Sequence, residues 1–147
     1  MRYYEDLVIG ESKLSGEFEL TKENIIEYAK EWDPQPFHID EVAAKDYPMG
    51  LIASSAHLFS IAIKLGTSPE IQDGLAGIAG LGWDNMRISQ PGRPGDRLRL
   101  KTSLQAKRES KSRQDVGIMT ALIELINQNN EPVLSYTSSM MVLKNGA

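Results

Sequence analysis

The residues best suited to acid–base chemistry lie in one short segment, Asp33-Pro34-Gln35-Pro36-Phe37-His38-Ile39-Asp40. Asp33 and His38 are five residues apart, and His38 is one of only two histidines in the chain. Each proline fixes its own φ and disfavours helical geometry in the residue before it, so we expect a stiff, non-helical loop over residues 33–38. A stiff loop suits a catalytic pair, because acid–base chemistry depends on a maintained geometry.

The chemistry available to this segment is the activation of water. An aspartate and a histidine can hold one water molecule between them and share its protons. The alternatives are structural: His38 could anchor its loop by hydrogen bonds, and Asp33 could bond to backbone N–H groups at a helix end. We expect Asp40 to cap a short helix, and a metal site made of Asp33, His38 and Asp40 is not expected, because the spacing matches no recognised set of ligands.

Helices are predicted to dominate the first half of the chain. Weak alternation over residues 13–20 indicates a first strand, and Thr21 is a plausible N-cap for a helix over residues 22–32. Residues 41–46 are predicted to form a short helix. A long apolar helix is expected from about Ser54 to Leu65 and, being apolar nearly all round, it should be buried centrally. The predicted inner stripe of helix 22–32 consists of Ile25, Ile26, Ala29 and Trp32. The residue expected to stop the long helix is Gly66.

Strands are predicted for the second half. Residues 97–106 alternate, which is typical of a strand with one buried face, and residues 116–126 are apolar on both faces, as in a central or interface strand. Turns are expected at 91–96 and 129–132, and a last strand at 133–143. The face predicted to be buried on strand 97–106 consists of Leu98, Leu100, Leu104 and Ala106. One buried helix wrapped by an antiparallel sheet is an α+β domain.

Composition predicts one folded domain over residues 1–147. Hydrophobic residues make up 41% of the chain and charged residues 24%, so a core can form. The absence of cysteine excludes disulfides and thiolate chemistry and agrees with a cytoplasmic location. The polar, acidic start, Met1–Asp6, is not expected to be a signal peptide, and the longest apolar stretch, Leu51–Leu65, is too short and polar to span a membrane.

Charge is distributed unevenly along the chain. The net charge of −4 argues against nucleic acid as a partner. Residues 87–113 nevertheless contain nine basic side chains and two acidic ones, so this window is +7 and the remainder is −11. Such a local basic surface suits a small anionic ligand, although Arg97, Arg99 and Lys101 also fit the solvated face of an ordinary strand.

Three stretches resemble the MaoC-like dehydratase family, which includes the (R)-specific enoyl-CoA hydratases. Asp33-Pro34-Gln35-Pro36-Phe37-His38 is similar to the family pattern Asp-x-Asn-Pro-x-His. Gly50–His57 resembles the start of the family's central helix, and Arg93–Leu98 its turn into a long strand. The resemblance runs from about Tyr3 to Lys144 and implies the hotdog fold, in which a curved antiparallel sheet wraps a long central helix.

The resemblance also implies roles for individual residues. Asp33 and His38 match the pair that activates water in the family's hydratases, and Ser55 occupies the place of a glycine whose backbone N–H binds the thioester oxygen. Gln35, Ser60 and His57 are expected to support the site. The implied reaction is reversible addition of water to a 2-enoyl thioester in fatty acid metabolism, with no metal or redox cofactor. The basic residues expected to contact coenzyme A phosphates, or else to be solvated, are Arg108, Lys111 and Arg113.

Two departures from the family pattern affect this expectation. Gln35 replaces the usual asparagine, so the hydrogen bonds within the loop could differ. Ser54-Ser55 replaces the usual His-Gly pair, and serine would fit less well than glycine if the position requires a positive φ. A non-catalytic acyl-thioester-binding protein is therefore one alternative. A hotdog thioesterase is another, although residues 54–65 contain no carboxylate to activate water for acyl transfer.

The expected partners follow from the same resemblance. The substrate would be an acyl thioester of coenzyme A or of an acyl carrier protein. The protein would form a homodimer or a larger homo-oligomer, with two sheets joined edge to edge and each site near the subunit boundary. His57, which lies on an apolar helix, is more typical of a core or interface position than of a catalyst.

Overall fold

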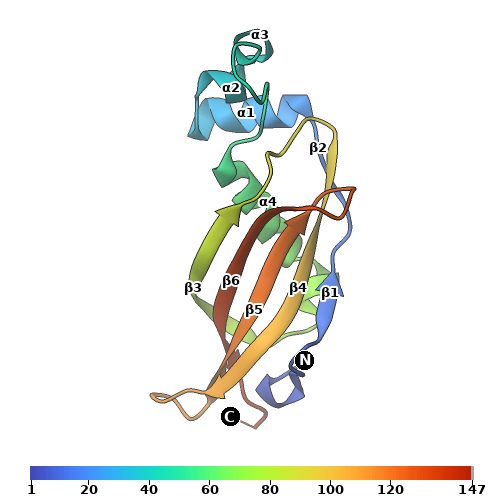
Figure 1. Ribbon diagram of the computed structural model, residues 1–147. Coiled ribbons are helices and arrows are strands. Elements are labelled where there is room, and N and C mark those ends of the chain that lie inside the picture. The colour runs from blue at the N-terminus through green and yellow to red at the C-terminus, as the bar shows by residue number, and fades with distance from the viewer. Residues whose placement is uncertain (147) are drawn as a thin grey trace.

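A long helix, α4 (Ser55–Gly66), packs against one face of a curved antiparallel sheet in the computed structural model, which describes residues 1–146 (Figure 1). The order of strands across the sheet is β1-β4-β5-β6-β3, and β2 also pairs with β4. The strands are β1 (Ser12–Leu14), β2 (Phe18–Leu20), β3 (Gly77–Ile88), β4 (Asp96–Glu109), β5 (Val116–Ile126) and β6 (Pro132–Leu143). The remaining helices are η1 (Tyr4–Asp6), α1 (Lys22–Trp32), α2 (Pro36–Ile39), α3 (Glu41–Ala44) and α5 (Pro69–Gln72). This architecture confirms the predicted α+β class.

The main core lies between α4 and the concave face of the sheet. Leu58, Ile61 and Leu65 of α4 are almost fully buried in one hydrophobic cluster with leucines of β4, β5 and β6. The opposite face of α4 is open, however, because Ser55, Ala56, Ser60, Ile63 and Lys64 are exposed in the single chain. The predicted central burial of this helix therefore holds for the face toward the sheet and not for the opposite face of the single chain.

The first helix forms where its cap predicts. The Thr21 side chain accepts a hydrogen bond from the Asn24 N–H at 3.1 Å, which fixes the start of α1. Ile25 and Ala29 are fully buried, whereas Trp32, predicted to be on the same stripe, is 67% exposed. Trp32 is the last helical residue, beyond the part of α1 that covers the core.

The predicted first strand over residues 13–20 is split in two. Between β1 and β2, Ser15 is buried, and its hydroxyl accepts a hydrogen bond from the Leu100 N–H at 2.8 Å. This bond replaces a backbone bond of the ladder, so β1 and β2 both pair with β4 but do not form one continuous strand.

The Pro-rich segment is partly helical, which corrects the prediction of a non-helical loop over residues 33–38. Pro36 is the first residue of α2, where its missing N–H is not needed and its fixed φ suits a helix. The extended geometry enforced before each proline ends at Gln35 (φ −77°, ψ 146°). Asp40 then caps α3, accepting from the N–H groups of Val42 and Ala43, and α3 ends at Ala44, two residues earlier than predicted.

The strands of the second half lie close to their predicted limits, and β5 is a central strand, as predicted. Ala106 is exposed although Leu98, Leu100 and Leu104 are buried, because a register shift between Leu104 and Ala106 turns the later residues of β4. Gly66 is the last residue of α4 and does not stop it; Thr67 is the C-cap.

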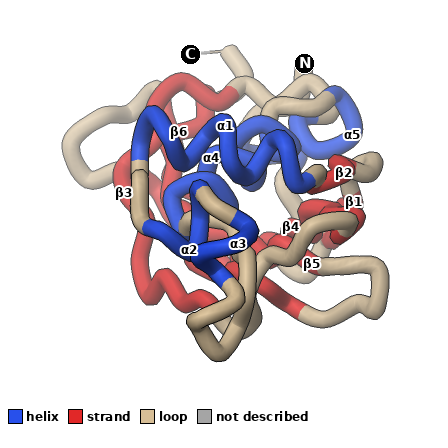
Figure 2. Tube along the Cα trace, turned by 90° about the horizontal axis from the view of Figure 1, so that it is seen from above, coloured by secondary structure: helices blue, strands red, loops and turns tan. Residues whose placement is uncertain are grey.

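Helices α1, α2 and α3 gather at one end of the sheet (Figure 1; Figure 2), and the turn between β4 and β5 lies at the other end (Figure 1). The loop before β4 contacts the start of α4, because the Ala53 N–H donates to the Gly92 carbonyl at 2.8 Å. A Cβ at Gly92 would lie 2.7 Å from Leu58 Cδ2, so glycine permits this close approach. None of the helices within residues 1–146 is long and apolar enough to cross a membrane.

Candidate active site

Asp33 is fixed at the end of α1 by two side-chain hydrogen bonds. As the C-cap residue, it donates its backbone N–H to the Ala29 carbonyl at 2.8 Å. The Ser54 hydroxyl donates to Asp33 Oδ2 at 2.7 Å, and the Gln35 amide donates to Oδ1 at 3.0 Å. These two bonds, that of Ser54 first, lower the pKa of the Asp33 carboxyl below its usual value. Asp33 is therefore a carboxylate at neutral pH.

His38 is buried in α2 and is oriented by a backbone carbonyl. Its Nδ1 lies 2.6 Å from the Ile52 oxygen, and because a carbonyl can only accept, Nδ1 carries the proton. In the neutral imidazole the Nε2 atom is then unprotonated. Nε2 lies 3.4 Å from Asp33 Oδ2, and the edge of the Phe37 ring packs against the imidazole.

The pair is arranged to hold a proton donor between two acceptors. With neutral His38, Nε2 and Asp33 Oδ2 both accept, so a water molecule that donates to each would satisfy both atoms. When Nε2 takes a proton, the imidazolium faces the carboxylate, which stabilises the charge. The Asp33 side chain is 28% exposed, so the pair is open to solvent on this side. The geometry supports removal of a proton from water and its later return.

The start of α4 presents backbone donors beside this pair. Ser55 is the first residue of α4, and the first N–H groups of a helix have no acceptor within the helix. Within residues 1–146 the Ser55 N–H has no hydrogen-bond partner. Because the positive end of the helix dipole lies here, the site can stabilise an oxyanion.

Serine at residues 54 and 55 introduces no backbone strain. Ser54 has φ −58° and ψ 143°, and neither serine is among the residues with positive φ. The N–H of Ser55 is thus available as a glycine N–H would be. Gln35 likewise keeps a contact within the loop, through its bond to Asp33.

Ser54 belongs to this candidate site by its contact with Asp33, although the sequence did not predict it as a site residue. It stands at the N-cap of α4, but its hydroxyl makes no cap hydrogen bond and instead donates to Asp33. Its side chain is 1% exposed. A serine just before a predicted helix indicates a cap, and only the packing of α1 against α4 shows that another group uses the hydroxyl. The Ile52 carbonyl was also missed, because a backbone atom leaves no signal in the sequence.

Ser60 and His57 lie on α4 but make no hydrogen bond to Asp33 or His38. The Ser60 hydroxyl donates to the Ala56 carbonyl at 2.9 Å and lies 3.1 Å from the Tyr28 hydroxyl. The His57 ring stacks on the Tyr28 ring, with centroids 4.3 Å apart and 6° between planes. Both contacts with Tyr28 join α1 to α4.

His57 is a buried, neutral side chain. It is 3% exposed, and burial lowers its pKa to about 4. Its Nδ1 is buried and, within the described part of the chain, has no hydrogen-bond partner. The structure therefore places His57 in the α1–α4 interface, as expected for a core or interface histidine.

The basic residues proposed for coenzyme A phosphates lie far from this site in the same chain. Arg108 is near the end of β4, and Lys111 and Arg113 follow in the turn to β5, at the opposite end of the sheet from α1 and α2 (Figure 1). About 40 Å of extended strand separates Arg108 from the start of β4. Arg113 is also paired with Asp115. A role at this site would require the turn of another subunit.

Comparison with known proteins gives the family. The model of the MaoC like domain matches residues 8–125. The uncharacterized protein YdeM of Bacillus subtilis is 30% identical over 142 residues, covering 94% of this chain and 96% of YdeM. A MaoC-like dehydratase structure from Rhodospirillum rubrum is 35% identical, with full coverage of both chains and a TM-score of 0.91.

More distant structures share the fold alone. The R-hydratase PhaJ1 from Pseudomonas aeruginosa is 16% identical, with a TM-score of 0.75, and the match covers 97% of this chain and 86% of the PhaJ1 chain. A Mycobacterium tuberculosis protein described as having a double hotdog fold is 17% identical, with a TM-score of 0.72. The match covers 99% of this chain and 45% of that protein. The chain therefore belongs to the MaoC-like dehydratase family and has the hotdog fold.

Proposed function

We propose that this protein is a hydratase/dehydratase that adds water reversibly across the C2–C3 double bond of a 2-enoyl thioester, giving the 3-hydroxyacyl thioester. The observation that supports this proposal is the Asp33–His38 pair, with Nε2 and Oδ2 3.4 Å apart beside the open N-terminus of α4. Family membership makes a hydratase or dehydratase the expected class.

The proposed reaction begins with a water molecule that donates to His38 Nε2 and to Asp33. Nε2 removes one proton as the water oxygen bonds to C3, and the π electrons move through C2 to the thioester oxygen. The Ser55 N–H and the dipole of α4 stabilise the resulting enolate. The imidazolium then returns its proton to C2, so one water is added overall. Asp33 stays ionised, orienting the water and stabilising the imidazolium.

We propose that the acyl tail of the substrate lies along one face of α4. Residues that are three or four positions apart lie on the same face of a helix. One such face of α4 consists of Ser55, Phe59, Ile63 and Gly66. With a rise of 1.5 Å per residue, Ile63 is about 12 Å beyond Ser55. A thioester with its carbonyl at the Ser55 N–H would lay its tail along this face. Either a coenzyme A or an acyl-carrier-protein thioester would fit.

The test uses purified protein and trans-2-enoyl-CoA substrates of several lengths, with loss of the conjugated thioester absorbance as the signal. Asp33→Asn and His38→Ala should each lower kcat by about 100-fold or more, because each removes part of the water-activating pair. Asp40→Asn is the matched control, since the Asp40 side chain accepts from the N–H groups of Val42 and Ala43 at the start of α3. Turnover by Asp33→Asn at the wild-type rate would contradict the proposal. Release of free thiol instead of hydration would indicate a thioesterase.

We also propose a homodimer joined along β3. This edge strand pairs with β6 on one side, and within residues 1–146 no strand pairs with its other side. The strand exposes five large hydrophobic side chains: Ile78, Leu81, Trp83, Met86 and Ile88. An exposed apolar edge strand favours pairing with a second copy.

A further inference from the structure

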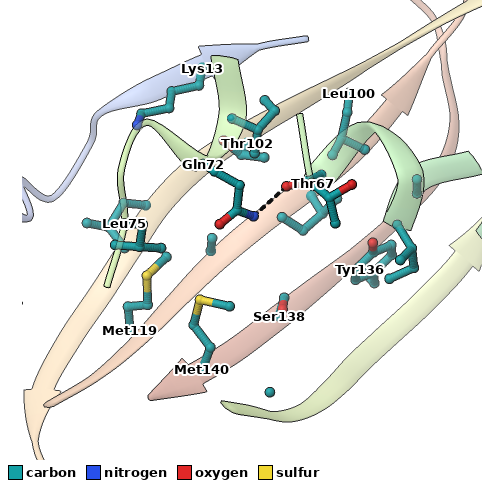
Figure 3. Close-up of a pocket in the computed structure, with 18 of the residues that line it drawn as sticks. Lys13, Thr67, Gln72, Leu75, Leu100, Thr102, Met119, Tyr136, Ser138 and Met140 are labelled. Carbon is teal, nitrogen blue, oxygen red and sulfur yellow. Dashed lines mark hydrogen bonds between the residues drawn. The ribbon is translucent and has the colours of Figure 1, made fainter. Parts of the chain in front are cut away.

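A partly open cavity lies between the second half of α4, α5 and the concave face of the sheet (Figure 3). Its volume is about 260 Å³, and none of Asp33, His38, Ser54 or Ser55 lines it. The walls are mostly apolar, with a few polar side chains among them. Such a lining is typical of small-molecule pockets, in which a few polar groups set specificity.

The cavity exists because small residues face each other across the core. Ala62 and Gly66 of α4 lie opposite Ala121 of β5 and Ser138 of β6. Ala121 pairs with Ser138 and also with Leu104, so the two small side chains are neighbours in one row across the sheet. A row nearer the start of β4 is filled instead by Leu100, Leu125 and Leu134.

Two hydroxyl groups face this cavity from β6. Tyr136 and Ser138 are two residues apart and so lie on the same face of the strand, and both line the cavity (Figure 3). Within residues 1–146, neither hydroxyl has a hydrogen-bond partner, in contrast to Thr67, which donates to the Lys64 carbonyl. Burial raises the pKa of Tyr136 to about 12, so the phenol stays protonated and can donate. Neither oxygen is among the fully enclosed polar atoms of residues 1–146, so solvent can reach both, and an apolar tail that displaced this solvent would leave both hydroxyls unpaired at a cost in free energy.

Aromatic side chains connect the cavity with the catalytic end of α4. The Phe59 ring contacts Trp83 and Tyr136 edge to face, with centroids 5.0 and 5.4 Å away. Trp83, Tyr136 and Ile63 line the cavity, and Phe59 and Ile63 continue the helix face that begins at Ser55. A tail that follows this face from Ser55 reaches the cavity.

We infer that the substrate carries a hydroxyl or carbonyl group toward the far end of its acyl tail, and that Tyr136 and Ser138 select for it inside the cavity. The inference rests on the proposed thioester hydration, because that reaction places the carbonyl at Ser55. A purely aliphatic tail would leave both hydroxyls unpaired, whereas an oxygenated tail can accept from Tyr136 and bond to Ser138.

The test compares trans-2-enoyl-CoA substrates of equal tail length that end in a methyl or in a hydroxymethyl group. The wild-type protein should prefer the hydroxylated tail by about tenfold in kcat/KM, the effect of one hydrogen bond. Tyr136→Phe and Ser138→Ala should each reduce this preference, which is the ratio of the two kcat/KM values measured for the same variant. The matched control is Ser139→Ala, because Ser139 lies on the other face of β6, next to Thr120. Equal rates for both tails, or a preference that survives both substitutions, would overturn the inference.

Calorimetry separates this inference from the proposed reaction. Saturated acyl-CoA thioesters, with and without the terminal hydroxyl, bind without reacting, so their Kd values report on the cavity alone. If no enoyl thioester is turned over but the hydroxylated ligand binds more tightly in a way that depends on Ser138, the hydration proposal fails and the cavity assignment stands. If methyl-ended substrates are hydrated and no preference for hydroxyl is found in rate or binding, only the cavity assignment fails. Circular dichroism and thermal melting confirm that each variant is folded.

Discussion

At the scale of single residues, the site is built around one carboxylate held by neighbours that come from two parts of the chain. Gln35 lies two residues from Asp33, whereas Ser54 reaches it from the start of α4. The shorter bond, at 2.7 Å, is that of Ser54 and is the first cause of the lowered Asp33 pKa. The ionisation of Asp33 thus depends on Ser54, the residue next to Ser55, whose backbone N–H is the proposed oxyanion donor.

The Ser54→Ala substitution should weaken catalysis without abolishing it. Loss of one hydrogen bond to a carboxylate is worth about 1.5 kcal/mol or more, so kcat should fall by roughly tenfold. Because the bond lowers the pKa of Asp33, its loss raises that pKa, and activity on the acidic side should be lost at a higher pH. The pH profile of kcat/KM measures both effects. Ser55→Ala is the control, since it keeps the backbone N–H of residue 55. If the pH profile of kcat/KM for Ser54→Ala fell on the acidic side at the same pH as that of wild type, the role assigned to Ser54 would be contradicted.

At the scale of secondary structure elements, the site depends on how α1 packs against α4. Asp33 is the residue that ends α1, and Ser54 is the residue that precedes α4. The contact between the two helices includes the stacked rings of Tyr28 and His57 and the bond from Tyr28 to Ser60. Ile25 and Ala29 are buried on the same side of α1. The stack therefore helps to set the distance between Asp33 and the start of α4.

The His57→Phe substitution should keep the stack and change the dependence of stability on pH. The folded protein keeps His57 neutral down to about pH 4, whereas the unfolded chain binds a proton near pH 6.5. Between these values the unfolded state binds more protons, so wild-type stability should fall on acidification by up to about 1.4 kcal/mol per pH unit. Phenylalanine cannot bind a proton, and it removes the buried, unpaired Nδ1.

Urea unfolding of wild type and His57→Phe between pH 4 and 8 measures the difference. The variant should be equal to or more stable than wild type at pH 8, and its advantage should grow below pH 6.5. His57→Leu is the comparison that removes the aromatic stack at similar volume, and we expect it to lower kcat by disturbing Asp33 relative to Ser54. Parallel pH profiles of stability for wild type and His57→Phe would show that His57 is not buried as described.

At the scale of the whole molecule, one chain leaves surfaces that a second chain would cover. The outer side of β3 and the open face of α4 are both exposed. The basic turn between β4 and β5 is also distant from the site of its own chain (Figure 1). A dimer through β3 would bury apolar edge residues and bring another subunit close to the open face of α4.

The Leu81→Lys substitution should shift the protein toward monomer. Leu81 is 47% exposed on the edge strand, and a lysine there blocks edge-to-edge pairing. Light scattering after size exclusion should show a wild-type mass of at least twice 16.3 kDa and a smaller mass for the variant. Val42→Lys on α3 is the control, because Val42 is 73% exposed and lies away from β3. A monomeric wild type would refute the dimer.

The local sequence predicted most elements and the pair at the centre of the site. Helix 22–32 and strand 116–126 agree with the structure at both ends, because their caps, turns and periodic patterns are local signals. The Asp33–His38 pair was predicted from its spacing, since both residues lie on one short segment. Errors occurred where a neighbouring element decides the outcome: Ser15 interrupts the first strand by bonding to Leu100, and a register shift turns Ala106 outward.

What the sequence alone determined is the longer helices and strands, the α+β class and the presence of Asp33 and His38 on one short segment. The tertiary structure decided which groups reach that loop: the Ser54 hydroxyl contacts Asp33 and the Ile52 carbonyl contacts His38, each from 14 or more residues away in the chain. It also decided where the cavity lies, because a void depends on small side chains from helix and sheet meeting across the core. Contacts between residues distant in sequence depend on packing, and no local pattern encodes them.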